Sequence, residues 1–115
     1  MNAGTPVPGS LSISSETDQD TVHITLQGEL DLASAPQMQE HLRAAGDSAP
    51  ARVVVDLARL AFIDSTGLRV LLQADARARE LGYELVLRPG EPSVQRVFEV
   101  TGATDMLRFE HAPEG

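Results

Sequence analysis

The chain has 115 residues, a length that fits one compact domain around a single core. Its formal net charge is −8 and every basic side chain is arginine, which argues against binding to nucleic acid or to an anionic membrane surface. The lack of cysteine excludes disulfides, thiolate metal sites and cysteine nucleophiles. No apolar run approaches the roughly 20 residues of a membrane span, and residues 1–10 do not resemble a secretory signal. These features favour a cytoplasmic protein.

The first part of the chain predicts a flexible segment followed by two strands. Residues 1–10 are rich in glycine and proline, so we expect a flexible N-terminal segment. Apolar and polar residues alternate from Leu11 to Ser14 and from Val22 to Gln27, with turn-forming residues at Asp18–Asp20. This pattern favours an antiparallel hairpin with one polar face.

A helix is predicted after residues 28–31. Ser34 and Gln37 have the spacing of a capping box, and Pro36 is tolerated in a first helical turn. We expect Gly46 to end this helix. Its apolar stripe consists of Met38, Leu42 and Ala45. A docking surface is one interpretation of Leu32, Met38 and Leu42, and core packing is the preferred one.

The middle of the chain predicts a central strand and a long amphipathic helix. The β-branched run Arg52–Leu57 is typical of a strand covered on both faces, and residues 58–63 lead from it to Asp64. Beyond Gly67, apolar residues recur at helical spacing as far as Gly82. On this helix Asp75 and Arg79 have the spacing of an i,i+4 ion pair.

The last part predicts a buried strand over Glu84–Leu87 and a helix from Pro92 to Gly102. Residues Met106–Phe109 suggest a final short strand, and residues 110–115 a flexible C-terminal tail. Alternating strands and helices favour right-handed crossovers and a mostly parallel sheet, which the first hairpin makes mixed. The predicted fold is therefore a single α/β domain over residues 11–109, with a mixed sheet flanked by helices.

The turn Asp64-Ser65-Thr66-Gly67 is the most informative motif, because it follows a buried strand and opens the longest helix. One interpretation is structural: Asp64 or Ser65 caps the first N–H groups of the helix. A second is functional, because these N–H groups and the helix dipole also stabilise a phosphate on a hydroxyl at this position. Such a phosphate would act on a protein that docks over the turn.

Three ordered blocks resemble the STAS-domain anti-sigma factor antagonists. Residues 53–57 and 62–72, with Asp-Ser-Thr-Gly at their centre, look like the family's main motif. Residues 28–35 are similar to its upstream segment, and residues 97–102 to its last helix and stop. The resemblance runs from about Leu11 to Phe109 and implies the STAS fold.

The resemblance also implies a mechanism without enzymatic activity in the chain. The unphosphorylated antagonist binds an anti-sigma factor that is also a serine kinase, and this binding releases a sigma factor. The kinase phosphorylates the serine that maps to Ser65, the complex breaks, and a PP2C-type phosphatase restores the unmodified form. Thr66 is a secondary phosphorylation candidate. The expected partner-binding residues are Asp31, Asp64, Ser65, Thr66 and Gly67.

Other functions have less support in the residues. The three histidines, His23, His41 and His111, show no metal spacing, and we expect no metal and no cofactor. A Ser-His-Asp hydrolase would lack its usual nucleophile turn, and a receiver domain would lack its lysine. The remaining alternative is a STAS scaffold subunit in another complex, such as a stressosome-like assembly or a lipid-transport accessory.

Overall fold

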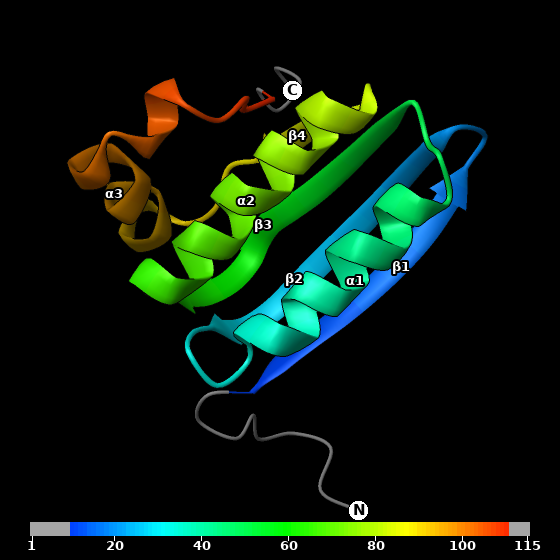
Figure 1. The fold of residues 1–115 in the computed structure, drawn as a ribbon. Coiled ribbons are helices and arrows are strands. Elements are labelled where there is room, and N and C mark those ends of the chain that lie inside the picture. The colour runs from blue at the N-terminus through cyan, green and yellow to red at the C-terminus, as the bar shows by residue number, and fades with distance from the viewer. Residues whose placement is uncertain (1–9, 111–115) are drawn as a thin grey trace, which may run out of the picture.

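The computed structural model describes residues 10–110, so most of the predicted flexible segments, 1–10 and 110–115, lie outside the described residues. Strands and helices alternate along this part of the chain (Figure 1). They are β1 (Leu11–Asp18), β2 (Thr21–Leu30), α1 (Ala35–Asp47), β3 (Arg52–Ile63), α2 (Ser65–Leu81), β4 (Glu84–Arg88), α3 (Pro92–Thr101) and the short 3-10 helix η1 (Ala103–Asp105).

The sheet has the strand order β1-β2-β3-β4. β1 pairs antiparallel with β2, which confirms the hairpin, and the other neighbouring strands are parallel. The predicted last strand over Met106–Phe109 is wrong: a single parallel bridge joins Phe109 to Leu87, with Leu87 N donating to Arg108 O at 2.9 Å. Residues 103–105 form η1, and the chain that follows reaches β4 only at this bridge.

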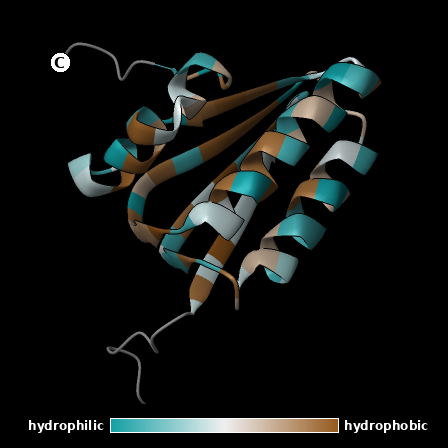
Figure 2. Ribbon diagram, turned by 60° about the vertical axis from the view of Figure 1, so that its left-hand side comes forward, coloured by the Kyte–Doolittle hydropathy of each residue, from teal (hydrophilic) through white to brown (hydrophobic). Residues whose placement is uncertain are grey.

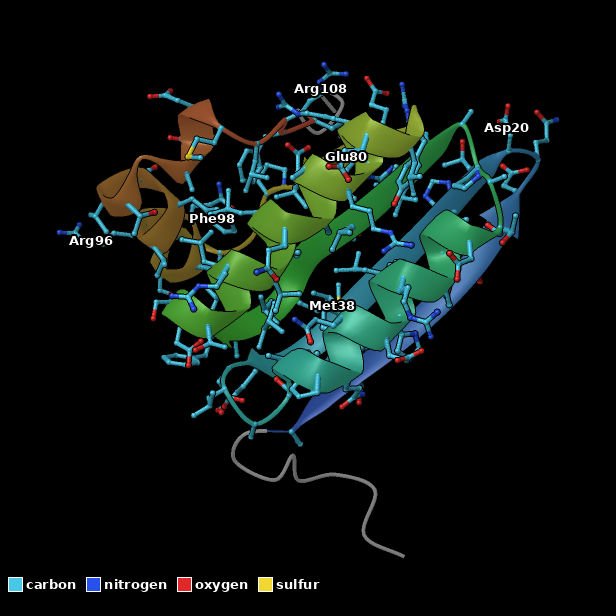
Figure 3. All side chains as sticks on the ribbon, viewed as in Figure 1. Asp20, Met38, Glu80, Arg96, Phe98 and Arg108 are labelled. Atoms are coloured by element: carbon cyan, nitrogen blue, oxygen red, sulfur yellow. The ribbon has the colours of Figure 1, made fainter. Side chains whose placement is uncertain are left out.

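The core lies between the sheet and the helices. α1 and α2 lie side by side in front of the sheet, and α3 follows on the side of β4 (Figure 1). Buried apolar residues of the helices and strands form this layer, and Met38 and Phe98, labelled in Figure 3, are fully buried in it. Figure 2 shows hydrophobic residues on the strands and, alternating with hydrophilic ones, on the helices. α1 connects the parallel strands β2 and β3, and α2 connects the parallel strands β3 and β4. Such strand–helix–strand connections are right-handed in nearly all proteins.

The strand Arg52–Leu57 is buried on both faces, as predicted, but the face of the sheet opposite α1 and α2 is covered in a different way. Val54 points to this face and is 2% exposed, although no helix of the described chain covers it. Polar side chains surround it instead, among them His23 and the ion-paired Asp56 and Arg88. Burial of β3 on its second side therefore comes from neighbouring side chains and not from a second helical layer.

The capping box predicted for α1 is wrong. The Ser34 hydroxyl donates to Glu29 O at 2.8 Å and does not cap the helix, while Gln37 Nε2 donates to Leu11 O at 3.0 Å. Gly46 also does not end α1, which continues to Asp47. A Cβ atom at Gly46 would lie 2.6 Å from the Tyr83 hydroxyl oxygen, so a larger residue there would displace the Tyr83 side chain.

The other helix boundaries agree with prediction. α2 ends at Gly82, whose φ of 85° places it in the left-handed region that glycine favours. α3 begins at Pro92 and ends at Gly102, which also has a positive φ. The predicted ion pair is present, with Arg79 Nε 2.9 Å from Asp75 Oδ2.

β3 is longer than predicted and ends directly before the Asp-Ser-Thr-Gly turn. Residues 58–63, expected as a connection, continue the strand as far as Ile63, with two register shifts against β2. The register then pairs Leu30 with Ile63. Because β2 and β3 are parallel, the segments that follow both strands leave the same edge of the sheet.

Candidate functional site

The predicted site residues lie together where β2 and β3 end. Asp64 N donates to Leu30 O at 3.2 Å, which joins the start of α2 directly to the end of β2. Asp31 follows Leu30, so the loop before α1 lies against the turn that opens α2. The structure thus brings together Asp31 and the Asp-Ser-Thr-Gly turn, which are more than thirty positions apart in the sequence.

Asp64 is the N-cap of α2 and also contacts the neighbouring loop. Its Oδ1 atom accepts a hydrogen bond from Gly67 N at 2.9 Å, as expected for a helix cap. Its Oδ2 atom accepts from Leu32 N at 3.2 Å. One carboxylate therefore binds both the first turn of α2 and the loop between β2 and α1.

Ser65 is the accessible hydroxyl of the turn. It is the first residue of α2 and is exposed, while Thr66 is half-buried. Within residues 10–110 the Ser65 hydroxyl makes no hydrogen bond, so it is available to another molecule. Its position at the helix N-terminus favours negative charge. Arg69 lies one turn further along α2, and helical side chains point back toward the N-terminus.

Gly67 is buried because α2 approaches β2 and β3 closely at this point. A Cβ atom here would lie 2.6 Å from Leu30 O, 2.7 Å from Leu30 Cγ and 3.1 Å from Ile63 Cγ1. Backbone atoms cannot move away as easily as the end of a side chain can. Gly67 therefore allows the start of α2 to pack against the ends of β2 and β3, and it offers no side chain to a partner.

Asp31 shapes the loop before α1. Its Oδ1 atom accepts hydrogen bonds from Ala33 N at 3.0 Å and from Ser34 N at 3.1 Å. Ser34 is 3% exposed, and its hydroxyl accepts from Asp31 N at 3.0 Å while it donates to the end of β2. This internal network fixes the loop, and the half-buried Asp31 lies beside Leu32 at its surface.

Two exposed apolar residues lie close in sequence to the site residues: Leu32, for which core packing was the preferred prediction, and Phe62, which sequence reasoning missed. Leu32, expected to pack in the core, is 73% exposed, because the loop network directs the residue after Asp31 outward. Phe62 is 48% exposed at the end of β3. Their signal in the sequence was position alone: Leu32 directly follows Asp31, and Phe62 lies two residues before Asp64. We call Asp31, Leu32, Asp64 and Ser65 together the Ser65 surface.

The described residues show no second chemical site of the kinds considered. Over residues 10–110 no group of three histidine, cysteine, aspartate or glutamate side chains is arranged to hold a metal ion. His23 lies on the polar face of the sheet and His41 on α1, while His111 lies outside the described residues. No helix in this part of the chain is long and apolar enough to cross a membrane.

Comparison with known proteins identifies the class to which this fold and surface belong. The family model for the MlaB STAS domain matches residues 13–108. This match covers most of the chain, and the chain therefore belongs to the STAS domain family.

Among individual relatives, the chain is 32% identical over 96 residues to the anti-sigma-B factor antagonist of Listeria monocytogenes, covering 84% of each chain. It is 44% identical over 89 residues to BtrV of Bordetella bronchiseptica, named as a candidate anti-sigma factor antagonist, covering 77% of each.

Solved structures agree with this family. An anti-sigma factor antagonist from Mycobacterium paratuberculosis superposes with a TM-score of 0.78 and 25% identity, covering 96% of this chain and 92% of that one. SpoIIAA in its unphosphorylated form superposes with a TM-score of 0.76 and 26% identity, covering 90% of each chain. The Bacillus cell fate determinant SpoIIAA in its phosphorylated form gives 0.69 and 25%, covering 90% and 93%.

Proposed function

We propose that this STAS domain is an anti-sigma factor antagonist. In the unphosphorylated form it binds a serine-kinase anti-sigma factor through the Ser65 surface and so releases a sigma factor. Phosphorylation of Ser65 ends the binding, and a PP2C-type phosphatase reverses it. The chain acts as a protein-binding module in the cytoplasm, and the partner supplies the catalysis.

The main support for the proposal is the exposure, hydrogen bonding and position of Ser65. Ser65 combines an exposed hydroxyl that makes no hydrogen bond in the described chain with a place at the N-terminus of α2. Thr66, next to it, is half-buried and is the secondary candidate. The relatives named above are antagonists, and SpoIIAA, which has the same fold, has been solved in phosphorylated and unphosphorylated forms.

The proposed modification is a phosphoryl transfer from ATP to Ser65, and its reversal is a hydrolysis. The partner transfers the γ-phosphoryl group of ATP to Ser65 Oγ: the Oγ–P bond forms, the bond to ADP breaks, and the serine proton leaves. The phosphatase adds water across the Oγ–P bond and releases inorganic phosphate.

The added charge explains the loss of binding. A phosphate adds about 1.5 to 2 negative charges at pH 7. Asp31 and Asp64 already make this edge of the molecule acidic, while the first N–H groups of α2 tolerate an anion. The fold is therefore expected to persist, and the effect falls on the partner, which meets new charge and bulk at the centre of the contact.

The first test is phosphorylation by a candidate partner. The protein is incubated with ATP and the serine-kinase anti-sigma factors encoded in the same genome, followed by intact-mass and phosphosite analysis. We expect one phosphate, on Ser65, and release of the complex. The variant Ser65→Ala should keep the complex without being modified, and Ser65→Asp should lose it.

Two outcomes would contradict the proposal. Modification by none of the kinases, together with a stable complex with other STAS proteins, would favour the scaffold function. Equal unfolding of Ser65→Ala and Ser65→Asp, seen by circular dichroism, would show that the serine is needed only as part of the fold.

A further inference from the structure

The Asp64 carboxylate joins two segments that meet at the Ser65 surface. Oδ1 accepts from Gly67 N inside α2, and Oδ2 accepts from Leu32 N in the loop before α1. The two contacts have different partners and different consequences. The first caps a helix, whereas the second connects the residue beside the phosphorylation candidate to the most exposed large apolar side chain of the described chain.

The position of the Leu32 backbone depends on this contact more than the positions of the neighbouring loop residues do. The amides of Asp31, Ala33 and Ser34 are held inside the loop by Ser34 and Asp31. The Leu32 amide instead has Asp64 Oδ2 as its acceptor, across the gap between the two segments. Its side chain adds little restraint, because it is 73% exposed.

We infer that Asp64 is a positioning residue: its second carboxylate oxygen holds Leu32 in the orientation that the partner binds, and a phosphate on Ser65 releases it. This inference rests on the proposed function. It extends that function by assigning the effect of phosphorylation to the loop before α1 as well as to direct repulsion of the partner.

The release follows from competition at one helix end. A phosphate on Ser65 and the Asp64 carboxylate would carry like charge on adjacent residues, and both would seek the free N–H groups of the first turn of α2. The doubly charged phosphate is the stronger competitor for these donors. Rotation of the Asp64 carboxylate away from it breaks the bond to Leu32 N, which spans the segments and is the longer of the two at 3.2 Å.

The substitution Asp64→Asn separates the two contacts. Asparagine is as good a helix N-cap as aspartate, so its oxygen keeps the bond from Gly67 N. Its amide nitrogen is a donor and cannot accept from Leu32 N. Asp31→Asn is the matched control: it removes the same charge, and the bonds from Ala33 N and Ser34 N both reach one oxygen, which asparagine retains.

The measurement is amide–water exchange by NMR on the full-length, isotope-labelled protein. In Asp64→Asn we expect the Leu32 amide to exchange about tenfold faster, the scale of one lost hydrogen bond, with Gly67 unchanged. Asp31→Asn should leave the Leu32 amide as in the parent protein. Phosphorylated protein should show the same change at Leu32 as Asp64→Asn.

The outcomes separate this inference from the proposed function. An unchanged Leu32 amide in Asp64→Asn overturns the positioning role, whatever the kinase does. If the phosphorylated protein releases its partner while the Leu32 amide keeps its parent exchange rate, the switch stands and the coupling through Asp64 is wrong. Faster exchange in Asp64→Asn without any kinase that modifies Ser65 supports the positioning contact and removes the proposed switch.

Discussion

At the scale of single residues, the Ser65 surface depends on the buried Gly67. Gly67 lets the first turn of α2 rest against the end of β2, where a Cβ atom would lie 2.6 Å from Leu30 O. Its N–H also binds Asp64. A side chain at this position would move the start of α2 away from the sheet, and with it Asp64 and Ser65.

We expect Gly67→Ala to lower the free energy of unfolding by about 1–3 kcal/mol, the range for overpacking a filled site, as measured by urea denaturation. Gly82→Ala is the control. Gly82 has nothing within 4 Å of its added Cβ, so the variant should lose only about 1 kcal/mol through its positive φ. A Gly67→Ala protein as stable as the parent would show that α2 can shift freely here.

At the scale of the elements, α1 and α2 are held together at their far ends by the loop that follows α2. Tyr83 lies at the end of the groove between them, and its hydroxyl oxygen lies close to Gly46 of α1. Burial raises the pKa of Tyr83, Arg77 opposes this rise, and Asp47 adds to it. The neutral phenol is therefore the form that the packing of the two helices favours.

This packing can be measured because Tyr83 is the single tyrosine and the chain has no tryptophan. Titration by tyrosinate absorbance should give a higher midpoint in folded protein than the value of about 10 in urea. Because the folded pKa is the higher one, the stability contribution is present below the unfolded pKa and is lost as pH rises through the folded pKa. Tyr83→Phe should remove this loss, and identical midpoints in folded and unfolded protein would contradict the packing argument.

At the scale of the whole molecule, the exposed large apolar residues of the described chain lie in several separate regions. Leu32 belongs to the Ser65 surface, and Phe62 lies at the end of β3. Leu81 ends α2, while Val100 and Met106 lie on α3 and after η1. The face of the sheet opposite α1 and α2 carries ion pairs such as Arg52 with Glu84. A partner that responds to Ser65 must use the Ser65 surface, because the effect of a phosphate on contacts is local.

Leu32 and Val100 give a matched test, since they are 73% and 70% exposed. Leu32→Ser and Val100→Ser should each change the free energy of unfolding by less than about 0.5 kcal/mol. Leu32→Ser should weaken binding to the anti-sigma factor about tenfold, or about 1.4 kcal/mol, in isothermal titration calorimetry, while Val100→Ser should bind as the parent does. Equal losses in both variants would place the partner elsewhere.

The sequence predicted the order of the elements well where local signals are strong. The hairpin, the two helices that end at Gly82 and Gly102, and the Asp75–Arg79 pair all agree with the structure. Turn residues, glycines with positive φ and i,i+4 ion pairs depend on residues only a few positions apart. A local sequence pattern therefore predicts them directly. The Asp-Ser-Thr-Gly turn at the start of α2 is a local feature of the same kind.

The sequence-based predictions failed where contacts with residues far away in the sequence determine the local structure. Gln37 has the spacing of a capping box, but Leu11 O, brought close by the sheet, takes its hydrogen bond. Gly46 was predicted to end the helix, but it lies inside α1 and leaves room for the side chain of Tyr83, which follows α2. Leu32 reads as a core residue because apolar character alone cannot show that a loop network turns it outward.

The sequence by itself therefore determined the class of fold, the family and the candidate phosphorylation residue, because these depend on short motifs and on their order along the chain. Only the tertiary structure decided that one carboxylate of Asp64 contacts both α2 and the loop of Leu32. That contact exists because parallel pairing of β2 with β3 places Leu30 opposite Ile63. The pairing sets residues far apart in sequence within hydrogen-bonding distance, which no local pattern encodes.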